Sequence, residues 1–250
     1  MTEKIPKSMV EFSNKTLLAR IIDTFKECKI IDISVVVGHN SDVINFPNIK
    51  YFVNEKFAQT NMLESLFCAE ENIEGSVIIS YADILFEKKI LAKLIESNAD
   101  ITLVVDKNWI EYWKLRVENP IDDAHETVIL DSEDNIIGIG QEVKNIDEVD
   151  GHFIGLMKVQ NDGIKLLKDF YHKSKRNATS EYNPLNPHLT FENSRLVDLI
   201  QGLVCSGIQV KSIPIKNGWL EFDTIKDYEL YNNMKKNNTL SNIIKLEEVG

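Results

Sequence analysis

Apolar residues at helical spacing alternate with short β-branched runs in the first half of the chain. The run at 31–37 (IDISVVV) follows a helical pattern at 15–28, and the run at 76–82 (SVIISYA) precedes another at 87–97. These runs are continuously apolar, which is typical of strands in a parallel sheet covered on both faces. The predicted elements are helices at 15–28, 62–71 and 87–97 and strands at 31–37, 50–53, 76–82 and 100–105.

The pattern after residue 119 is mixed. Two apolar strands at 127–130 and 136–139 flank the polar turn DSEDN (131–135), which predicts a hairpin; the turn is acidic but lacks the glycine of a calcium loop. No repeat or linker interrupts the chain, so residues 1–250 are predicted to form one domain: a three-layer, Rossmann-like α/β fold with a mostly parallel sheet and a mixed second half. The further predicted elements are strands at 152–159 and 208–215 and helices at 163–173, 195–205 and 224–236.

An aspartate ends the buried strand at 76–82. In open α/β sheets ligands bind beyond the carboxyl ends of the strands, where Asp83 lies. A carboxylate facing a half-buried crevice is costly unless it meets a cation or several donors. Asp83 therefore indicates a cation site, and the alternative is an N-cap of the helix that begins near residue 87.

A second acidic segment, NGWLEFDTIKD (217–227), lies near the other end of the chain. Glu221 and Asp223 alternate with apolar residues, so both acids share one face of an extended segment. Asp223 also precedes a helix, and its alternative role is again an N-cap. Two aspartates from distant segments can hold one hard cation, and Mg²⁺ is usually bound by one or two carboxylates together with substrate phosphates.

Composition narrows the class of partner. A formal net charge of -11 argues against nucleic acid and anionic membranes, which both need a basic surface. No signal peptide or membrane-length apolar run is present, so we expect a cytoplasmic protein. Cys28, Cys68 and Cys205 are widely spaced among apolar residues and are predicted to be reduced, buried thiols, and no zinc spacing is found.

Six segments, taken in order, resemble the sugar-phosphate nucleotidyltransferase superfamily. TNMLESL (60–66) and VVDKNWIEYW (104–113) are similar to the small cytidylyltransferases for phosphocholine, aminoethylphosphonate or phosphoglutamine. The resemblance covers nearly the whole chain and implies transfer of CMP from CTP to a small amino- or ammonium-bearing phosphate or phosphonate, with release of pyrophosphate. The six segments are PKSMVEF (6–12), VVVGHNSDV (35–43), VNEKFAQTNMLESL (53–66), SYADILF (80–86), GHFIGLMKV (151–159) and WLEFDTIKDYE (219–229).

The resemblance implies a role for individual residues. Asp83 and Asp223 would bind Mg²⁺, and Lys7, from the Pro-Lys motif, would contact the nucleotide phosphates; the alternative for Lys7 is an ordinary surface lysine. These three form the expected catalytic set, because positioning and charge neutralisation supply most of the rate in such a transfer. The residues expected along the nucleotide are Thr60, Asn61, Ser65, Tyr81 and Ala82.

The acceptor pocket is predicted at the carboxyl end of the strand at 100–105. Aromatic faces and acids there suit an amine or quaternary ammonium group, and Lys107 would meet the acceptor phosphate. The alternative is a helix start whose Trp109 and Trp113, four residues apart, pack on the sheet. The candidate acceptor residues are Asp106, Lys107, Trp109, Tyr112 and Glu221.

One departure from the superfamily concerns the start of the chain. The resemblance implies an interior strand and a glycine-rich loop before the Pro-Lys motif, with backbone N–H groups that cradle the triphosphate. Here Met1 lies only five residues before Pro6, where the PKSMVEF segment begins. A truncated start is the preferred expectation, a natural non-catalytic member is the other, and in either case loss of activity and unpaired strand edges are expected.

Two other functions are kept as alternatives. One is a catalytically silent nucleotide-binding or regulatory domain of the same fold. The other is a metal-dependent glycosyltransferase, which usually needs Asp-x-Asp where this chain has Tyr81 before Asp83. The sequence leaves open the acceptor, the nucleotide and the oligomeric state, a homodimer included.

Overall fold

The computed structural model describes residues 5–120, 125–143 and 145–246. The helices in these ranges are α1 (Leu17–Glu27), α2 (Met62–Cys68), α3 (Lys88–Glu96), α4 (Trp109–Arg116), α5 (Asp162–Asn177), α6 (Leu196–Cys205) and α7 (Ile225–Lys236). The strands are β1 (Glu11–Phe12), β2 (Lys15–Thr16), β3 (Ser34–Val37), β4 (Lys50–Val53), β5 (Ser76–Ser80), β6 (Ile84–Phe86), β7 (Ile101–Asp106), β8 (Thr127–Leu130), β9 (Ile136–Ile139), β10 (Gly151–Gln160), β11 (Lys211–Ile215) and β12 (Trp219–Glu221).

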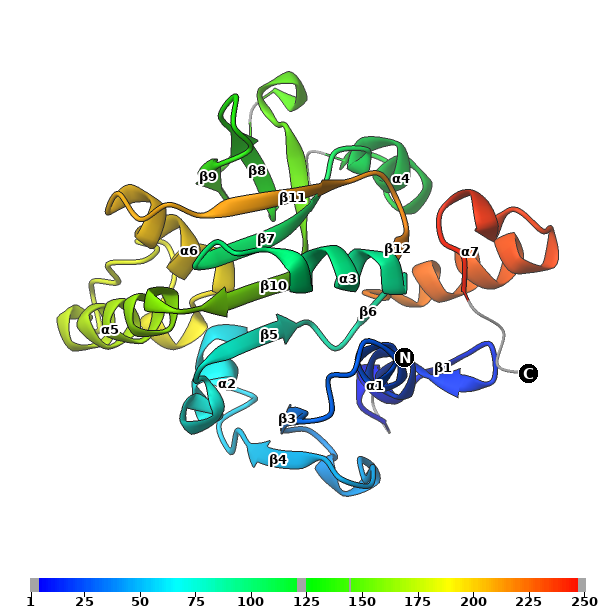
Figure 1. Cartoon of the computed structure of the whole chain (residues 1–250), viewed down its shortest axis with the longest axis horizontal. Coiled ribbons are helices and arrows are strands. Elements are labelled where there is room, and N and C mark those ends of the chain that lie inside the picture. Colours follow the sequence, from blue (N-terminus) through cyan, green and yellow to red (C-terminus); the bar gives the residue numbers. More distant parts are fainter. Residues whose placement is uncertain (1–4, 121–124, 144, 247–250) are drawn as a thin grey trace.

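A six-stranded sheet forms the centre of the molecule (Figure 1). Strands β5, β7 and β11 run in one direction, because β7 pairs in parallel with β11 while both β5 and β7 pair antiparallel with the long strand β10. One edge of β10 is shared by β5 and by β8, which continues into the β8–β9 hairpin. The carboxyl ends of β5, β7 and β11 therefore lie on one side of the sheet, where the sequence places the predicted site.

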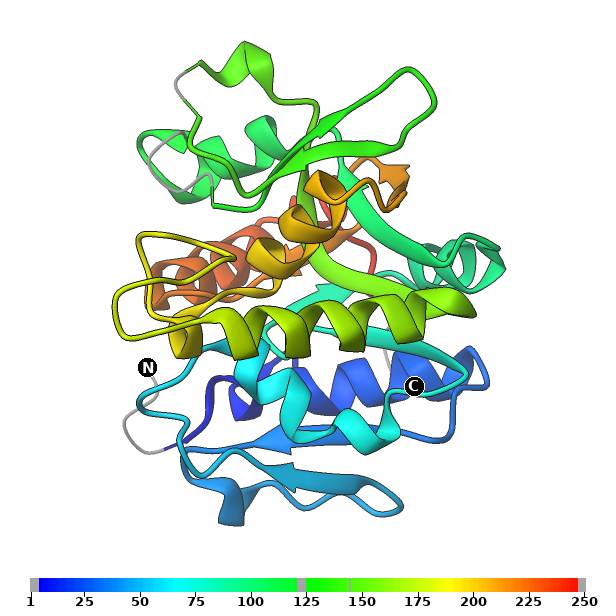
Figure 2. The ribbon, with the colours of Figure 1, turned by 90° about the vertical axis from the view of Figure 1, so that its left-hand side faces the viewer.

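Helices cover both faces of this sheet and make three layers (Figure 2). Successive residues of β7 enter opposite cores: Val104 packs with α1, α3 and α4, whereas Leu103 and Val105 pack with α2, α5 and α6. This alternation follows from the two-residue period of a strand. The predicted three-layer α/β fold is confirmed, and the antiparallel β10 belongs to the mixed second half that the sequence predicts.

A separate two-stranded parallel sheet, β3–β4, lies at the lower end of the molecule in both views (Figures 1 and 2). Within the described residues β3 pairs only with β4, and β5 pairs only with β10, so each has one edge without a strand neighbour. The family resemblance predicts unpaired strand edges of this kind, because the superfamily has a further interior strand before the Pro-Lys motif. A single domain over 1–250 stays a prediction.

The three cysteines differ from the sequence prediction. All are free, but Cys68 and Cys205 are exposed and Cys28 is only partly buried. The apolar neighbours of Cys68 and Cys205 face the core from helices α2 and α6, and helical geometry turns the cysteines away from it. The prediction that they are buried is wrong. Among the described residues, no helix combines the length and apolar character needed to cross a membrane.

Candidate active site

A short antiparallel ribbon carries the two predicted metal ligands. Strand β12 pairs with β6, and the backbone N–H of Phe222 donates to the carbonyl oxygen of Asp83 at 2.8 Å, which continues the ladder past the ends of both strands. Leu220 and Phe222 are fully buried, so the alternation along this segment turns Glu221 and Asp223 to the other side. Asp83 and Asp223 are therefore neighbours although they lie 140 positions apart in the chain.

Lys7 joins the two aspartates. Its Nζ lies 3.1 Å from a carboxylate oxygen of Asp83 and 2.8 Å from one of Asp223. Burial disfavours the charged ammonium, but the two carboxylates outweigh it and raise the pKa of Lys7. The structure thus brings together the three residues predicted to be catalytic.

Neither aspartate caps a helix. Helix α3 begins after Glu87, which forms no side-chain cap, and Asp83 lies before β6 instead. Helix α7 is capped by Thr224, whose side chain forms a reciprocal capping box with Asp227. The N-cap alternative is therefore excluded for both Asp83 and Asp223.

The residues present fit a divalent cation. The carboxylates of Asp83 and Asp223 face a common point, which is held here by a cationic nitrogen, and oxygen ligands of this kind are those that Mg²⁺ prefers. Within the described ranges no group of three or more His, Cys, Asp or Glu side chains is arranged to hold a metal. An ion at this point would need substrate phosphates or water as further ligands, as Mg²⁺ commonly does. Metal binding by the two aspartates stays a prediction.

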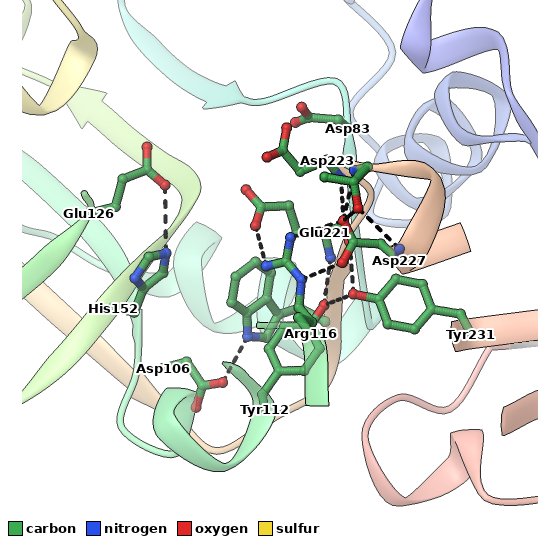
Figure 3. Close-up of polar contacts among 12 residues, drawn as sticks. Asp83, Asp106, Tyr112, Arg116, Glu126, His152, Glu221, Asp223, Asp227 and Tyr231 are labelled. Carbon is green, nitrogen blue, oxygen red and sulfur yellow. Dashed lines mark hydrogen bonds and ion pairs between the residues drawn. The ribbon is translucent and has the colours of Figure 1, made fainter. Parts of the chain in front are cut away.

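A buried ion-pair network lies beside this pair (Figure 3). The Arg116 side chain is 2% exposed and donates to both Glu221 and Asp227. Tyr112 and Tyr231 form a hydroxyl–hydroxyl hydrogen bond next to it, and the Tyr112 hydroxyl accepts from the backbone N–H of Glu221. Burial opposes the guanidinium charge, but these neighbours raise the pKa of Arg116, and the carboxyl pKa of Asp227 is lowered because the pairing outweighs its burial.

Several predicted acceptor residues belong to the core. Asp106 is fully buried and accepts from the Trp219 indole N–H at 2.8 Å and from the backbone N–H groups of Asn108 and Asn217. Trp109 and Tyr112 are also buried, and Trp109 packs edge-on to Trp113 at 5.8 Å. The packing alternative is correct for these side chains, and their predicted contact with the acceptor is wrong because no surface is left for it.

Lys107 points elsewhere. Its ammonium pairs with Asp134 of the β8–β9 hairpin at 2.9 Å, and both side chains are exposed. Within the described part of the chain no contact links Lys107 to the aspartate pair, so the structure does not bring it to the site. Glu221 does lie at the site: it precedes Asp223 by two residues, and burial raises its pKa to about 7, with Arg116 opposing the rise.

The residues predicted along the nucleotide fall into two places. The buried amide of Asn54 donates to the hydroxyl groups of Thr60 and Ser65, and Asn61 caps α2 through the backbone N–H of Met62. These contacts make one polar group at the start of α2, and they explain why the predicted residues occur together. Their contact with a nucleotide stays a prediction.

Tyr81 and Ala82 lie next to Asp83. Ala82 is exposed, and the Tyr81 hydroxyl donates to Glu126 at 2.8 Å. The backbone of β10 makes room for Tyr81: Gly155 has φ +80°, and a Cβ there would lie 2.4 Å from the Tyr81 ring. Tyr81 is therefore fixed beside Asp83 by both its ring and its hydroxyl.

Sequence reasoning missed Arg116, Glu126, His152 and Asn54. Arg116 ends a helix in a charged stretch, where an exposed side chain is the ordinary expectation, and Glu126 follows a polar segment outside any predicted strand. The partners of these side chains come from distant elements, so spacing along the chain carries no signal for them.

A mixed α/β sheet that presents paired aspartates and a lysine beyond the carboxyl ends of its strands defines a class of protein, an α/β enzyme that handles phosphates. The chain belongs to the MobA-like NTP transferase domain family, whose model matches residues 1–129. It is 32% identical over 242 residues to CTP:phosphoglutamine cytidylyltransferase of Campylobacter jejuni, and the match covers 92% of both chains.

Two further proteins are similar to the chain, one in sequence and one in fold. The chain is 33% identical over 91 residues to choline-phosphate cytidylyltransferase of Streptococcus pneumoniae, covering 35% of this chain and 40% of that protein. The fold superposes on the inositol-1-phosphate CTP transferase from T. maritima with a TM-score of 0.66 and 20% identity, covering 98% of this chain and 91% of the other. The predicted relationship to the small cytidylyltransferases is confirmed, and nothing in these matches favours a glycosyltransferase.

Proposed function

We propose that the protein transfers CMP from CTP to a small phosphate or phosphonate that carries an amino or ammonium group, with Mg²⁺ as cofactor and pyrophosphate as the second product. The observation that carries this proposal is the convergence of Asp83, Asp223 and Lys7 at one point. The relatives named above are cytidylyltransferases of phosphoglutamine and of choline phosphate, which supports CTP as the donor.

The side chains fit the charge changes of this reaction. An oxygen of the acceptor attacks the α-phosphorus of CTP, the bond to the β-phosphate oxygen breaks, and the electron pair leaves with pyrophosphate. Mg²⁺, when bound by Asp83 and Asp223, would neutralise negative charge that builds up on the phosphates. Lys7, now paired with both aspartates, is long enough to turn its ammonium to a phosphate oxygen.

Binding contacts supply the rest of the expected rate. Holding donor and acceptor in line replaces a bimolecular encounter by a positioned one, and such positioning provides a large part of the acceleration in transfers of this kind. The polar group at the start of α2 is the proposed contact of the nucleotide. A cytoplasmic location and a homodimer are also part of the proposal.

The test is release of pyrophosphate. The protein is incubated with CTP, Mg²⁺ and, in turn, phosphocholine, phosphoethanolamine, 2-aminoethylphosphonate and inositol 1-phosphate, and pyrophosphate is measured by a coupled assay. We expect turnover with at least one nitrogen-bearing acceptor and none when EDTA removes the metal. CTP binding without turnover on any acceptor would contradict the proposal and favour the catalytically silent alternative.

A further inference from the structure

Glu126 is a buried carboxylate that pairs with no lysine or arginine in the part of the chain that the structure describes. Its side chain is 14% exposed and, from the described residues, accepts one hydrogen bond, donated by the neutral Tyr81 hydroxyl. Within the described residues no lysine or arginine forms an ion pair with it. The positive charge of Arg195 acts on Glu126 from a distance, but Arg195 is itself paired with Asp198. A carboxylate taken out of water and left without a counter-charge is costly, so a native site of this kind calls for an explanation.

The polar ring of His152 lies beside Glu126. The His152 side chain is 2% exposed, and neither ring nitrogen has a hydrogen-bond partner among the described residues. Its Nε2 points at the Glu126 carboxylate from 3.7 Å, beyond hydrogen-bonding distance (Figure 3). Burial holds the pKa of His152 at about 3, so the ring is neutral and supplies no positive charge to Glu126.

The position of Glu126 places this carboxylate at the proposed active site. The loop that carries it is fixed by a hydrogen bond from the backbone N–H of Phe153 to the Glu126 carbonyl oxygen, on the edge of β10 that also receives Tyr81. The negative charges of Glu221 and Asp83 act on Glu126 and add to the effect of burial. Three carboxylates thus share one region, and Arg116 and Lys7 neutralise only the other two.

We propose that Glu126 binds the cationic nitrogen of the acceptor, opposite Glu221, and so makes the enzyme select phosphates that carry an ammonium group. The inference rests on the proposed function, because it assigns a role at the same site. An ammonium group beside the Glu126 carboxylate would supply the missing counter-charge.

The test compares two ligands that differ only in charge. Phosphocholine and 3,3-dimethylbutyl phosphate have the same shape, but a carbon atom replaces the quaternary nitrogen in the second. Each is titrated by calorimetry into the wild-type protein with Mg²⁺ and a CTP analogue that carries a methylene group between the α- and β-phosphates, so that binding is measured without turnover. We expect wild type to prefer phosphocholine by about tenfold or more, the effect of one desolvated charge contact.

Glu126→Gln removes the charge and keeps an oxygen that can accept from Tyr81, so the fold is retained. We expect the preference to fall to near one while the affinity for the neutral ligand changes little, and Glu126→Asp to retain part of the preference. The matched control is Glu133→Gln, the same change on an exposed turn residue of the β8–β9 hairpin, which should leave the preference unchanged.

Three results would overturn the inference: equal affinity of wild type for both ligands, no binding of phosphocholine, or an equal loss for both ligands in Glu126→Gln. The last would mean that Glu126 only supports the pocket. The inference and the proposed function fail separately. A charge preference that depends on Glu126, in a protein that releases no pyrophosphate, would leave the binding role standing and reject the transferase.

Discussion

Asp223 and Asp227 lie one helical turn apart at the start of α7, and their surroundings differ. Asp227 is buried and holds the Arg116 guanidinium, the Thr224 hydroxyl and two backbone N–H groups. The Asp223 side chain is 52% exposed and pairs with the flexible ammonium of Lys7. The Asp227 carboxylate is therefore buried and bonded to the protein, whereas about half of the Asp223 side chain is exposed to solvent.

The difference separates structural acids from acids with room for a ligand. Both carboxylate oxygens of Asp227 accept hydrogen bonds from the protein itself, so the Arg116 network is complete without substrate. The pair of Asp83 and Asp223 keeps exposed oxygen atoms, and its one cationic partner sits on a long side chain. The comparison predicts that changes in the first region affect stability and that changes in the second affect turnover.

The largest effect is expected from Arg116→Met. This change removes the guanidinium and leaves Asp227 and Glu221 buried without a counter-charge, which costs about 3–5 kcal/mol. Chemical denaturation in urea measures the loss in the free energy of unfolding. Lys114→Met on the same helix is the matched control: Lys114 pairs with Glu111 in solvent, and exposed pairs contribute about 0–1 kcal/mol.

A loss below about 1 kcal/mol for Arg116→Met would break the comparison, because that value is typical of an exposed pair. Such a result would mean that Asp227 and Glu221 can be buried without Arg116 at little cost. The Arg116 network and the Asp83–Asp223 pair would then not differ in their contribution to the free energy of unfolding.

The next effect is expected from Asp83→Asn and from Asp223→Asn. Each removes one carboxylate from the proposed metal position, and we expect the rate of pyrophosphate release to fall about 10²–10³-fold, as is typical when one preorganised electrostatic group is lost. The free energy of unfolding should change by less than about 1 kcal/mol, since the pair with Lys7 is partly exposed.

Asp32→Asn is the control for these variants, because Asp32 forms an exposed pair with Lys50 far from the ribbon of β6 and β12. It should leave the rate unchanged. Full activity in either active-site variant would rule out the proposed catalytic role of the aspartate pair. A loss of stability that accounts for the whole fall in rate would mean that the pair supports the fold and does not act in catalysis.

Much of the fold could be predicted from the sequence. Continuous apolar runs predicted β7 and β10 within one or two residues, and the turn chemistry of DSEDN predicted the β8–β9 hairpin. The ribbon of β6 and β12 was missed, because three-residue strands are too short for a periodic signal. That ribbon is what joins Asp83 to Asp223, so the convergence rested on the family resemblance and on the rule for strand ends.

The acceptor residues were harder to predict than the aspartates. Trp109 and Tyr112 follow a strand end, a position shared by binding residues and by core residues, and only the packed structure distinguishes the two. Glu126 and Arg116 meet partners from elements far away in the chain, and such pairings depend on tertiary packing. Local patterns identify elements, and they do not identify which buried charges are satisfied.

The smallest effect sharpens the comparison with a third kind of acid, since Glu126 is buried like Asp227 but pairs with no lysine or arginine among the described residues. Burial raises its pKa from 4.5 to about 8, so the folded protein keeps a proton that the unfolded chain releases between these values. Stability is therefore lost as the pH rises from about 4.5 to 8. In Glu126→Gln this loss disappears, and relative to wild type the variant should gain about 2–3 kcal/mol between pH 5 and pH 7, given about 1.4 kcal/mol per pKa unit.

Urea denaturation at pH 5, 7 and 9 without ligand measures this gain, and Glu133→Gln, on the exposed hairpin turn, should show none. A variant that instead loses stability at pH 9 would mean that Glu126 already has a counter-charge in the free protein, as Asp227 does. Glu126 would then resemble Asp227, whose charge is paired within the protein, and no unpaired charge would be left there for a ligand. A gain would place Glu126 with Asp83 and Asp223, as a carboxylate that the free protein leaves without a full set of partners.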